Sequence, residues 1–546
     1  MTHARDAPPT TREILEVLGS GQLDDIETVF DELWYDLPDR FADEVLRVVE
    51  QLPPVVLDRR PRLTHLALLA QQRRSHEHDD EQGLAQVQQL YTQAGLRYGR
   101  RLHVFGRPPD LLAAGTATVV AHRNRRDYLT SERIGAWAEA RSTQSSPLVT
   151  LPWTAARPEA RPGWLSAHRG ITAMLSGATD AAITLFNRAN DEAGDGPHAH
   201  YARLSATSHL ALLSAHRGHH VLARRQLGTI EHAAAFPDWT AGARAGGETI
   251  AQAQIAIDEG DPATALRLLS ALRRGARPDE LWAFHASTRA SYQAHYGEPL
   301  RGLRELDEER LRHGMVEPDH GTFLGRLILR AEAKLLLRTG GAGRVLQLAH
   351  ELDQDDVEWL APHHAWAHLT VGEHHEAIGL ASATLHRAPL SPADALELHV
   401  VLAVAHLRAG REDRARTWFQ RALRLRATPK HTAPFLTMRP QERETLTRLV
   451  GAPGVLSGGA ATAGHNAPGV TLAARLSPRE RAVLEALSEG CTAERAAERF
   501  SVSVNTVRTQ IRKIYAKLGV SSRKEAIAAG QELGLLTARR PPRSDR

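Results

Sequence analysis

Residues 259–269 read EGDPATALRLL, and residues 409–425 read AGREDRARTWFQRALRL. In each stretch a glycine is followed five residues later by a small residue: Gly260 by Ala265, and Gly410 by Ala415. Glycine can end a helix in the left-handed conformation, because it has no Cβ atom to make that conformation costly. The small residue then lets the next helix approach its neighbour closely. Both stretches therefore predict the turn and the second helix of a helical hairpin.

The same pair recurs along the chain, and successive glycines are separated by 32 to 43 residues, the period of stacked helical hairpins. Apolar residues recur at i, i+3 and i+4, and strand signals are scarce, which predicts an all-α body. The repeats resemble tetratricopeptide repeats, so we expect an α-solenoid of about seven degenerate hairpins with a concave ligand surface. The further pairs are Gly177/Ala182, Gly218/Ala223, Gly297/Gly302, Gly340/Val345 and Gly372/Ala377.

Composition limits the class of protein. A chain of 546 residues is too long for one ordinary domain. The single cysteine, Cys491, excludes an internal disulfide and a cysteine-based zinc site within one chain, which is typical of a reducing compartment. The N-terminus has no apolar signal-peptide core, and no run of 18 apolar residues follows. We therefore expect a cytoplasmic protein without a membrane span.

Catalytic motifs are absent from the sequence. It contains no GxxxxGK[ST] phosphate loop, no HExxH and no GxSxG, so we expect no enzyme, cofactor or metal. The 29 histidines are unusual, and His364 and His368 are spaced to share one helical face. Spacing fixes no carboxylate beside them, so solvated or capping histidines are the favoured interpretation; a metal-dependent hydrolase is the alternative. This cluster comprises His363, His364, His368, His374 and His375.

The C-terminal part differs in composition from the body. Residues 451–474 contain six glycines and two prolines, which predicts a flexible tether. Residues 471–546 hold 15 Lys/Arg and 8 Asp/Glu, whereas the rest of the chain is slightly acidic. A basic module suggests a polyanionic partner, although a solvated surface would have the same charge.

Four short helices are expected in this basic module. Ser477 and Glu480 can form a capping box at the start of the first helix, and Gly490 can end it. A tight turn, FSVS, joins the second and third helices, as in a helix-turn-helix. The expected second, third and fourth helices are residues 493–500 with Thr492 as cap, residues 504–518 with Ser503 as cap, and a helix capped by Ser522.

The third helix has two distinct faces. At 100° per residue, Val507, Ile511, Ile514 and Leu518 fall within about 60° of one another and face the core. In the major groove, arginine can reach guanine O6 and N7, and asparagine or threonine can reach base edges or phosphates. A solvated helix face is the alternative. The outer face carries Asn505, Thr509, Arg512, Lys513 and Ala516, flanked by Thr506 and Arg508.

This module resembles the LuxR-type helix-turn-helix family through LSPRE (476–480), VLEALSEG (483–490), VSVNTVRTQI (502–511) and KLGVSSRKEA (517–526). The resemblance implies that the third helix is the recognition helix and that the fourth supports dimer contacts. It implies that Arg508, Thr509 and Arg512 touch base edges or nearby backbone. It places Thr492, Ser503, Asn505, Thr506, Lys513 and Lys517 where the family contacts phosphates or shapes the turn. The chain departs from the family pattern at Arg495, Ala496 and Gln510.

The whole layout resembles the large MalT-like LuxR regulators without their NTPase module. It implies a sequence-specific transcriptional regulator, expected to be an activator, that binds double-stranded DNA as a homodimer and contacts RNA polymerase. The solenoid would sense a protein, peptide or small molecule. The alternative is a protein-interaction scaffold with the helix-turn-helix as a docking module. We expect a disordered tail at 1–10, a helical region at 11–160, repeats at 161–450, the tether at 451–474, the DNA-binding domain at 475–537 and a basic tail at 538–546.

Overall fold

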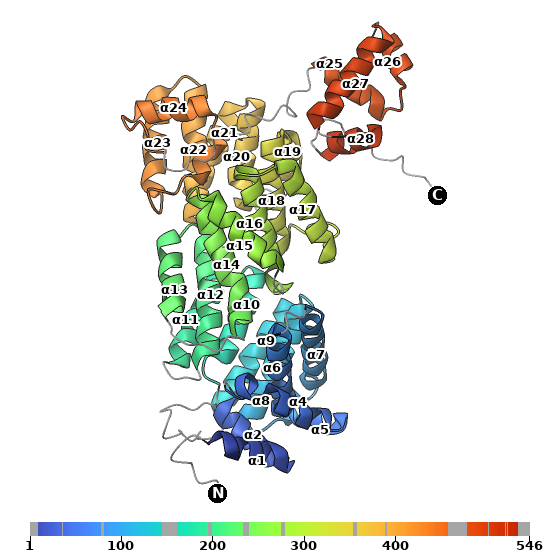
Figure 1. Ribbon diagram of the computed structural model, residues 1–546. Helices are drawn as coiled ribbons and strands as arrows, with labels where there is room; N and C mark the ends of the chain where they lie inside the picture. Colours follow the sequence, from blue (N-terminus) through green and yellow to red (C-terminus); the bar gives the residue numbers. More distant parts are fainter. Residues whose placement is uncertain are drawn as a thin grey trace.

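The computed structural model describes residues 9–34, 36–77, 81–144, 161–194, 199–232, 240–274, 279–352, 358–387, 390–456, 478–500, 502–518, 520 and 522–532. All regular secondary structure in these residues is helical, which confirms the all-α prediction (Figure 1). Among them, no helix combines the length and the apolar character needed to cross a membrane.

The N-terminal helices form one block at the blue end of Figure 1. Its core contains Phe30, Trp34 and Leu37, against which Trp164 of the next segment packs. Arg62 is buried in this block, and its guanidinium donates to Glu27, Asp31 and Asp110 from two other helices. The helices are α1 (Thr11–Ser20), α2 (Leu23–Leu33), α3 (Leu37–Arg40), α4 (Ala42–Glu50), α5 (Pro54–Leu57), α6 (Pro61–Glu77), α7 (Glu81–Gly99), the 3-10 helix η1 (Leu102–Val104), α8 (Pro108–Asn124) and α9 (Tyr128–Gln144).

Seven helical hairpins follow in the described residues. The first helices of successive hairpins, α10, α12, α14, α16, α18, α20 and α22, pack against one another in chain order, as expected for a solenoid. The hairpins are α10 (Trp164–Ser176) with α11 (Thr179–Ala193), α12 (His200–His216) with α13 (His220–His232), α14 (Thr240–Asp258) with α15 (Pro262–Arg274), α16 (Trp282–His295) with α17 (Pro299–Arg312), α18 (Phe323–Thr339) with α19 (Ala342–Glu351), α20 (Ala361–Val371) with α21 (His374–Arg387), and α22 (Pro392–Arg408) with α23 (Glu412–Leu425). The 3-10 helices η4 (Asp279–Leu281), η5 (Glu358–Leu360) and η6 (Ala433–Thr437) and the helix α24 (Pro440–Leu449) complete the body.

The predicted glycine pattern lies at the turn of every hairpin. Six of the seven glycines have φ between +70° and +95°, and all seven following small residues are buried. Gly297 is the exception, because its φ is not positive. There the side chain of Gln293 accepts a hydrogen bond from the Glu298 amide at 3.0 Å, so the turn closes without a left-handed glycine.

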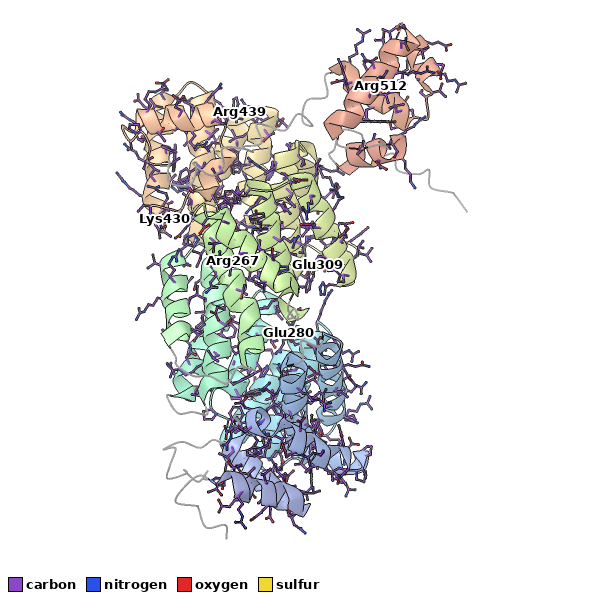
Figure 2. All side chains as sticks on the ribbon, in the orientation of Figure 1. Arg267, Glu280, Glu309, Lys430, Arg439 and Arg512 are labelled. Atoms are coloured by element: carbon purple, nitrogen blue, oxygen red, sulfur yellow. The ribbon has the colours of Figure 1, made fainter. Side chains whose placement is uncertain are left out.

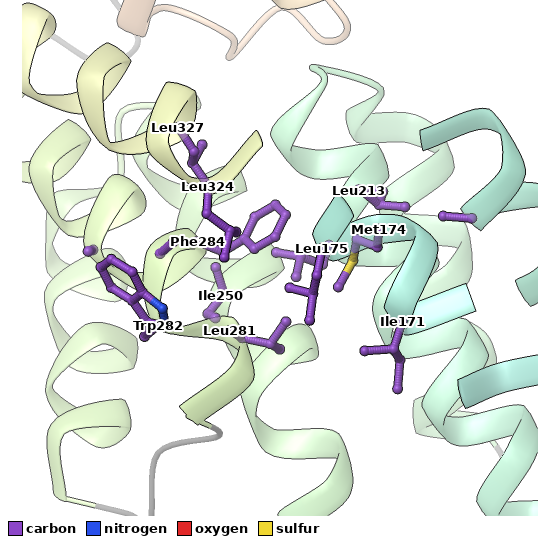
Figure 3. Packing of buried hydrophobic residues seen from close by; sticks show 14 of the residues in the cluster. Ile171, Met174, Leu175, Leu213, Ile250, Leu281, Trp282, Phe284, Leu324 and Leu327 are labelled. Carbon is purple, nitrogen blue, oxygen red and sulfur yellow. The ribbon is translucent and has the colours of Figure 1, made fainter. Parts of the chain in front are cut away.

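The two helices of a hairpin differ in how they are buried. In α23 only Ala415, Phe419 and Ala422 are buried, so this helix is amphipathic and covers the outside. In α22 nearly every residue from Leu396 to His406 is buried, because first helices have neighbours on several sides. Figure 3 shows part of one core, to which labelled residues of the first helices α10, α12, α14, α16 and α18 contribute.

The solenoid curls until distant hairpins touch. The amide of Ala393, at the start of α22, donates to the carbonyl of Arg217 after α12, at 3.1 Å. The amide of Thr432 donates to the carbonyl of Asp258, the last residue of α14, at 2.8 Å. The concave side is therefore narrowed to a polar cavity of about 80 Å³, lined by all first helices from α12 to α22 and by the segment around η6.

The histidine expectation was wrong for His363. It is only 3% exposed and lines the polar cavity, because α20 is a first helix and this side faces inward. His364 and His368 do lie together, with 3.0 Å between their Nε2 atoms, and Nδ1 of His368 is 2.7 Å from a carboxylate oxygen of Glu373. Spacing along the chain had not indicated this carboxylate.

The start of the expected tether belongs to the body. Leu456 is buried with Phe419 and Phe435, and Arg426 donates to the carbonyl of Val455 at 3.2 Å. Residues 451–456 therefore cover the last hairpin, because their two apolar side chains complete its core. Residues 457–474, the tail at 1–8 and the basic tail at 538–546 lie outside the described residues.

Replacing Gly218 with alanine tests the close approach of hairpins. Gly218 has φ +83°, and a Cβ atom there would lie 2.9 Å from the Ala393 amide nitrogen. Gly410 has φ +70° with open space around it. We expect Gly410→Ala to cost about 1–2 kcal/mol from backbone strain alone and Gly218→Ala to cost clearly more. Equal shifts in the thermal unfolding midpoint would contradict the packing account.

Acid should destabilise the body through its buried histidines. Burial, and then Lys334 and Arg338, lower the pKa of His295 to about 3. The unfolded chain binds this proton near pH 6.5, so stability falls as the pH drops below 6.5, by up to about 2 kcal/mol at pH 5 for one such histidine. The measurement is the unfolding midpoint of the wild type and His295→Gln at pH 7.5 and pH 5. His295→Gln should flatten the dependence, and the exposed His375→Gln should leave it as it is.

Candidate nucleic-acid interface

The C-terminal part forms the four predicted helices. They are α25 (Pro478–Ser488), α26 (Ala493–Arg499), α27 (Val504–Leu518) and α28 (Arg523–Glu532). Gly490 has φ +90° just after α25, as its predicted role in ending the helix requires. Ser477, expected to cap the first of these helices, lies outside the described residues.

One face of α27 is held by an apolar core. Val507 and Ile514 are fully buried against Val483, Leu484 and Leu487 of α25. Ile511 is partly buried in the same cluster. This confirms the predicted inner face at those positions, while the side chain of Leu518 lies outside the description. The core fixes the rotation of α27 about its own axis, so the opposite face is presented outward.

Hydroxyl caps begin α26 and α27, and a backbone hydrogen bond closes the turn between them. Thr492 accepts a hydrogen bond from the Arg495 amide at 3.3 Å, and Ser503 accepts one from the Thr506 amide at 3.1 Å. The amide of Val502 donates to the carbonyl of Ala497 at 3.0 Å, which closes the turn after α26. The two hydroxyl caps satisfy amides that the first turn of each helix leaves unpaired.

A hydrogen bond that the sequence did not reveal joins α28 to α25. Arg523, the first residue of α28, donates to the carbonyl of Leu487 near the end of α25 at 2.6 Å. A cation at a helix C-terminus satisfies a free carbonyl and suits the helix dipole. Only the placement of α28 beside α25 brings these two groups together.

The outward face of α27 gathers most of the predicted site residues. Asn505, Thr506, Arg508, Thr509, Arg512 and Lys513 are all exposed on it. The helix contains four basic residues and no acidic residue. Figure 2 labels Arg512 on this helix. Thr492 caps the start of α26 and Ser503 caps the start of α27. The side chain of Lys517 lies outside the description.

The polar groups of this face differ in how they are already paired. The hydroxyl of Thr509 donates to the carbonyl of Asn505 at 2.9 Å, and the hydroxyls of Ser503 and Thr506 are 2.7 Å apart. Arg512 and Lys513 form no ion pair with any described residue. The two cations are therefore the strongest groups on this face that a partner can engage.

Arg508 is paired with an acidic residue of α26. Its Nη2 lies 3.0 Å from an oxygen of Glu494, and both side chains are more than half exposed. The pKa of Glu494 is lowered, first by hydrogen bonds with its own backbone and with Thr492 and then by Arg508. Exposed pairs of this kind contribute little to stability, so Arg508 can exchange Glu494 for another anion at low cost.

Comparison with known proteins agrees with this geometry. Residues 474–529 match the model of the bacterial regulatory proteins, luxR family. The C-terminal domain is a luxR-family domain. No curated protein matches the chain. The luxR-family domain supports a DNA-binding transcriptional regulator, and its match spans the four helices up to the middle of α28.

Ser503 provides a test of the turn. Ser503→Ala removes the acceptor for the Thr506 amide and should cost about 0.5–2 kcal/mol locally. Ser503→Asp keeps an acceptor at the same position and should restore most of this stability. Hydrogen exchange of the α27 amides in the full chain measures both variants. Unchanged protection at Thr506 and Val507 in Ser503→Ala would show that the cap is not what holds the turn.

Proposed function

We propose that the protein is a sequence-specific transcriptional regulator whose helix α27 lies in the major groove of DNA. The observation that carries the proposal is the contrast between the two faces of α27: apolar and buried on one side, cationic and exposed on the other. An α-helix fits the major groove of B-DNA, and a cationic face is attracted by the flanking phosphates.

The proposed contacts divide into two groups. Arg508, Thr509 and Arg512 read base edges, with the arginine guanidinium groups directed at guanine O6 and N7. When Arg508 binds DNA, it exchanges its exposed ion pair with Glu494 for a contact with DNA. The free-energy cost of this exchange is small, because an exposed ion pair contributes little to stability. The remaining positions hold the sugar–phosphate backbone or shape the turn: Thr492, Ser503, Asn505, Thr506, Lys513 and Lys517.

One such domain contacts only a few base pairs. Specific affinity therefore needs two domains on symmetric half-sites, so we propose a homodimer on DNA, with α28 in the dimer contact. In this proposal residues 457–474 let the two domains reach their half-sites, and the solenoid receives the signal. The protein acts as an activator and contacts RNA polymerase. A scaffold is the second candidate, supported by the tetratricopeptide-like stacking of seven hairpins; DNA binding that is absent or insensitive to salt would favour it.

Genome-wide recovery of DNA bound by the full-length protein tests the proposal in the cell. The wild type should enrich a short list of sites that share an inverted repeat. Arg508→Ala with Arg512→Ala should lose these sites, because both guanidinium groups are on the proposed reading face. Arg448→Ala is the matched control, since Arg448 is an exposed arginine of α24 in the body. If the sites remain enriched in the double variant, α27 is not the helix that reads the DNA sequence.

Binding of the full chain to a recovered site then separates base contacts from phosphate contacts. Arg512→Ala should weaken specific binding by about 1–3 kcal/mol and leave unrelated DNA nearly unaffected. Lys513→Ala should weaken both about equally and lower the salt slope by about one. Equal loss on both DNAs for Arg512→Ala would reassign Arg512 to the backbone.

A further inference from the structure

Three segments that are far apart in the sequence bring potential metal ligands together in the body. His220 is the first residue of α13, Asp258 is the last of α14, and His431 precedes η6. The Nε2 atom of His220 lies 3.0 Å from Oδ2 of Asp258, and the ring centroids of His220 and His431 are 4.4 Å apart. One donor atom from each of the three residues lies within 4.8 Å of the others.

We propose that His220, Asp258 and His431 bind a divalent transition-metal ion of the zinc class. Imidazole nitrogen and carboxylate oxygen are donors that zinc, nickel and iron share. Around a tetrahedral zinc ion, with bonds of about 2.0–2.2 Å, donor atoms lie about 3.4 Å apart. The pair of His220 and Asp258 is already near this spacing, and His431 closes on it with a shift of about 1.5 Å or less.

The carboxylate is oriented by a second residue. Nε2 of Gln254, one helical turn before Asp258, donates to Oδ1 of Asp258 at 3.0 Å. This contact leaves Oδ2 directed at His220. The Asp258 carbonyl also accepts the Thr432 amide at 2.8 Å, which fixes the chain next to His431. An outer partner of this kind orients a ligand and is part of a working metal site.

The burial of the two histidines suits the same role. His220 is fully buried and His431 is 3% exposed, and Nδ1 of each has no hydrogen-bond partner among the described residues. Buried polar atoms are rarely left unpaired, so the described residues leave Nδ1 of both rings under-satisfied.

The ion would act where the solenoid closes. It would link the second and third hairpins to the segment that leaves the seventh, beside the hydrogen bonds from Ala393 and Thr432. That segment continues into α24 and towards the luxR-family domain. A ligand that binds only the closed arrangement stabilises it by mass action. The site lies in the body, so it goes beyond the proposed DNA binding and does not depend on it.

Zinc titration of the metal-stripped full-length protein by calorimetry tests the site, with visible absorption of bound Co²⁺ as a second readout. The wild type should bind one ion per chain. His431→Ala and Asp258→Asn should lose more affinity than the ~10–100-fold expected for Gln254→Ala, which removes only an outer partner. His364→Ala with His368→Ala is the matched control, because these two histidines also lie 3.0 Å apart, and it should keep the wild-type affinity.

Two results would overturn the site. One is the absence of saturable 1:1 binding by the wild type. The other is loss of the ion in the His364/His368 double variant while His431→Ala retains it. Circular dichroism of each variant shows whether the fold is kept, and Gln254→Ala leaves all three ligands in place. A graded loss in Gln254→Ala therefore supports the site even if a ligand variant unfolds.

Discussion

The close approach of helices at each hairpin turn is the constraint on which the rest of this structure depends. A left-handed glycine reverses the chain within a few residues, and a buried small residue lets the second helix lie against the first. Repetition of this geometry stacks the first helices in order. Because each step adds a rotation, the second hairpin meets the seventh, and the polar cavity forms where they meet. Larger residues at these positions would move every later hairpin.

Local signals in the sequence were sufficient to predict most of the elements. The glycine period located all seven hairpins, and hydroxyl caps with Gly490 located the four C-terminal helices, because both depend on residues close together in the chain. Gly297 failed as a left-handed residue since a side chain, Gln293, closes that turn instead. Closure of the solenoid could not be predicted. It depends on small rotations summed over five hairpins, and no motif marks Arg217 and Ala393 as partners.

In the candidate interface too, features set by nearby residues could be predicted and contacts between helices could not. Helical periodicity placed the exposed face of α27, because the buried positions Val507 and Ile514 fix the opposite side. It did not reveal that Arg508 pairs with Glu494 or that Arg523 bonds to α25. Those contacts join different helices, so they follow from the packing of the domain. The proposed metal ligands in the body could not be predicted for the same reason. A spacing of four residues pointed to His364 and His368, whereas His220 and His431 meet only because the solenoid closes.

The polar interior of the body bears on the proposal that the solenoid receives a signal. Arg330 and Asp394 pair inside it, and burial raises the pKa of the neighbouring Glu397. Buried charges of this kind are costly unless they are well paired, so an interior of this composition adds little to stability. The same groups interact strongly with any ion or polar molecule that enters, because water screens them poorly. A ligand shifts a conformational equilibrium only by its difference in affinity between the two states. The cavity is completed where the second and third hairpins meet the start of α22 and the segment before η6, so under the proposed function a ligand bound there would favour the closed arrangement.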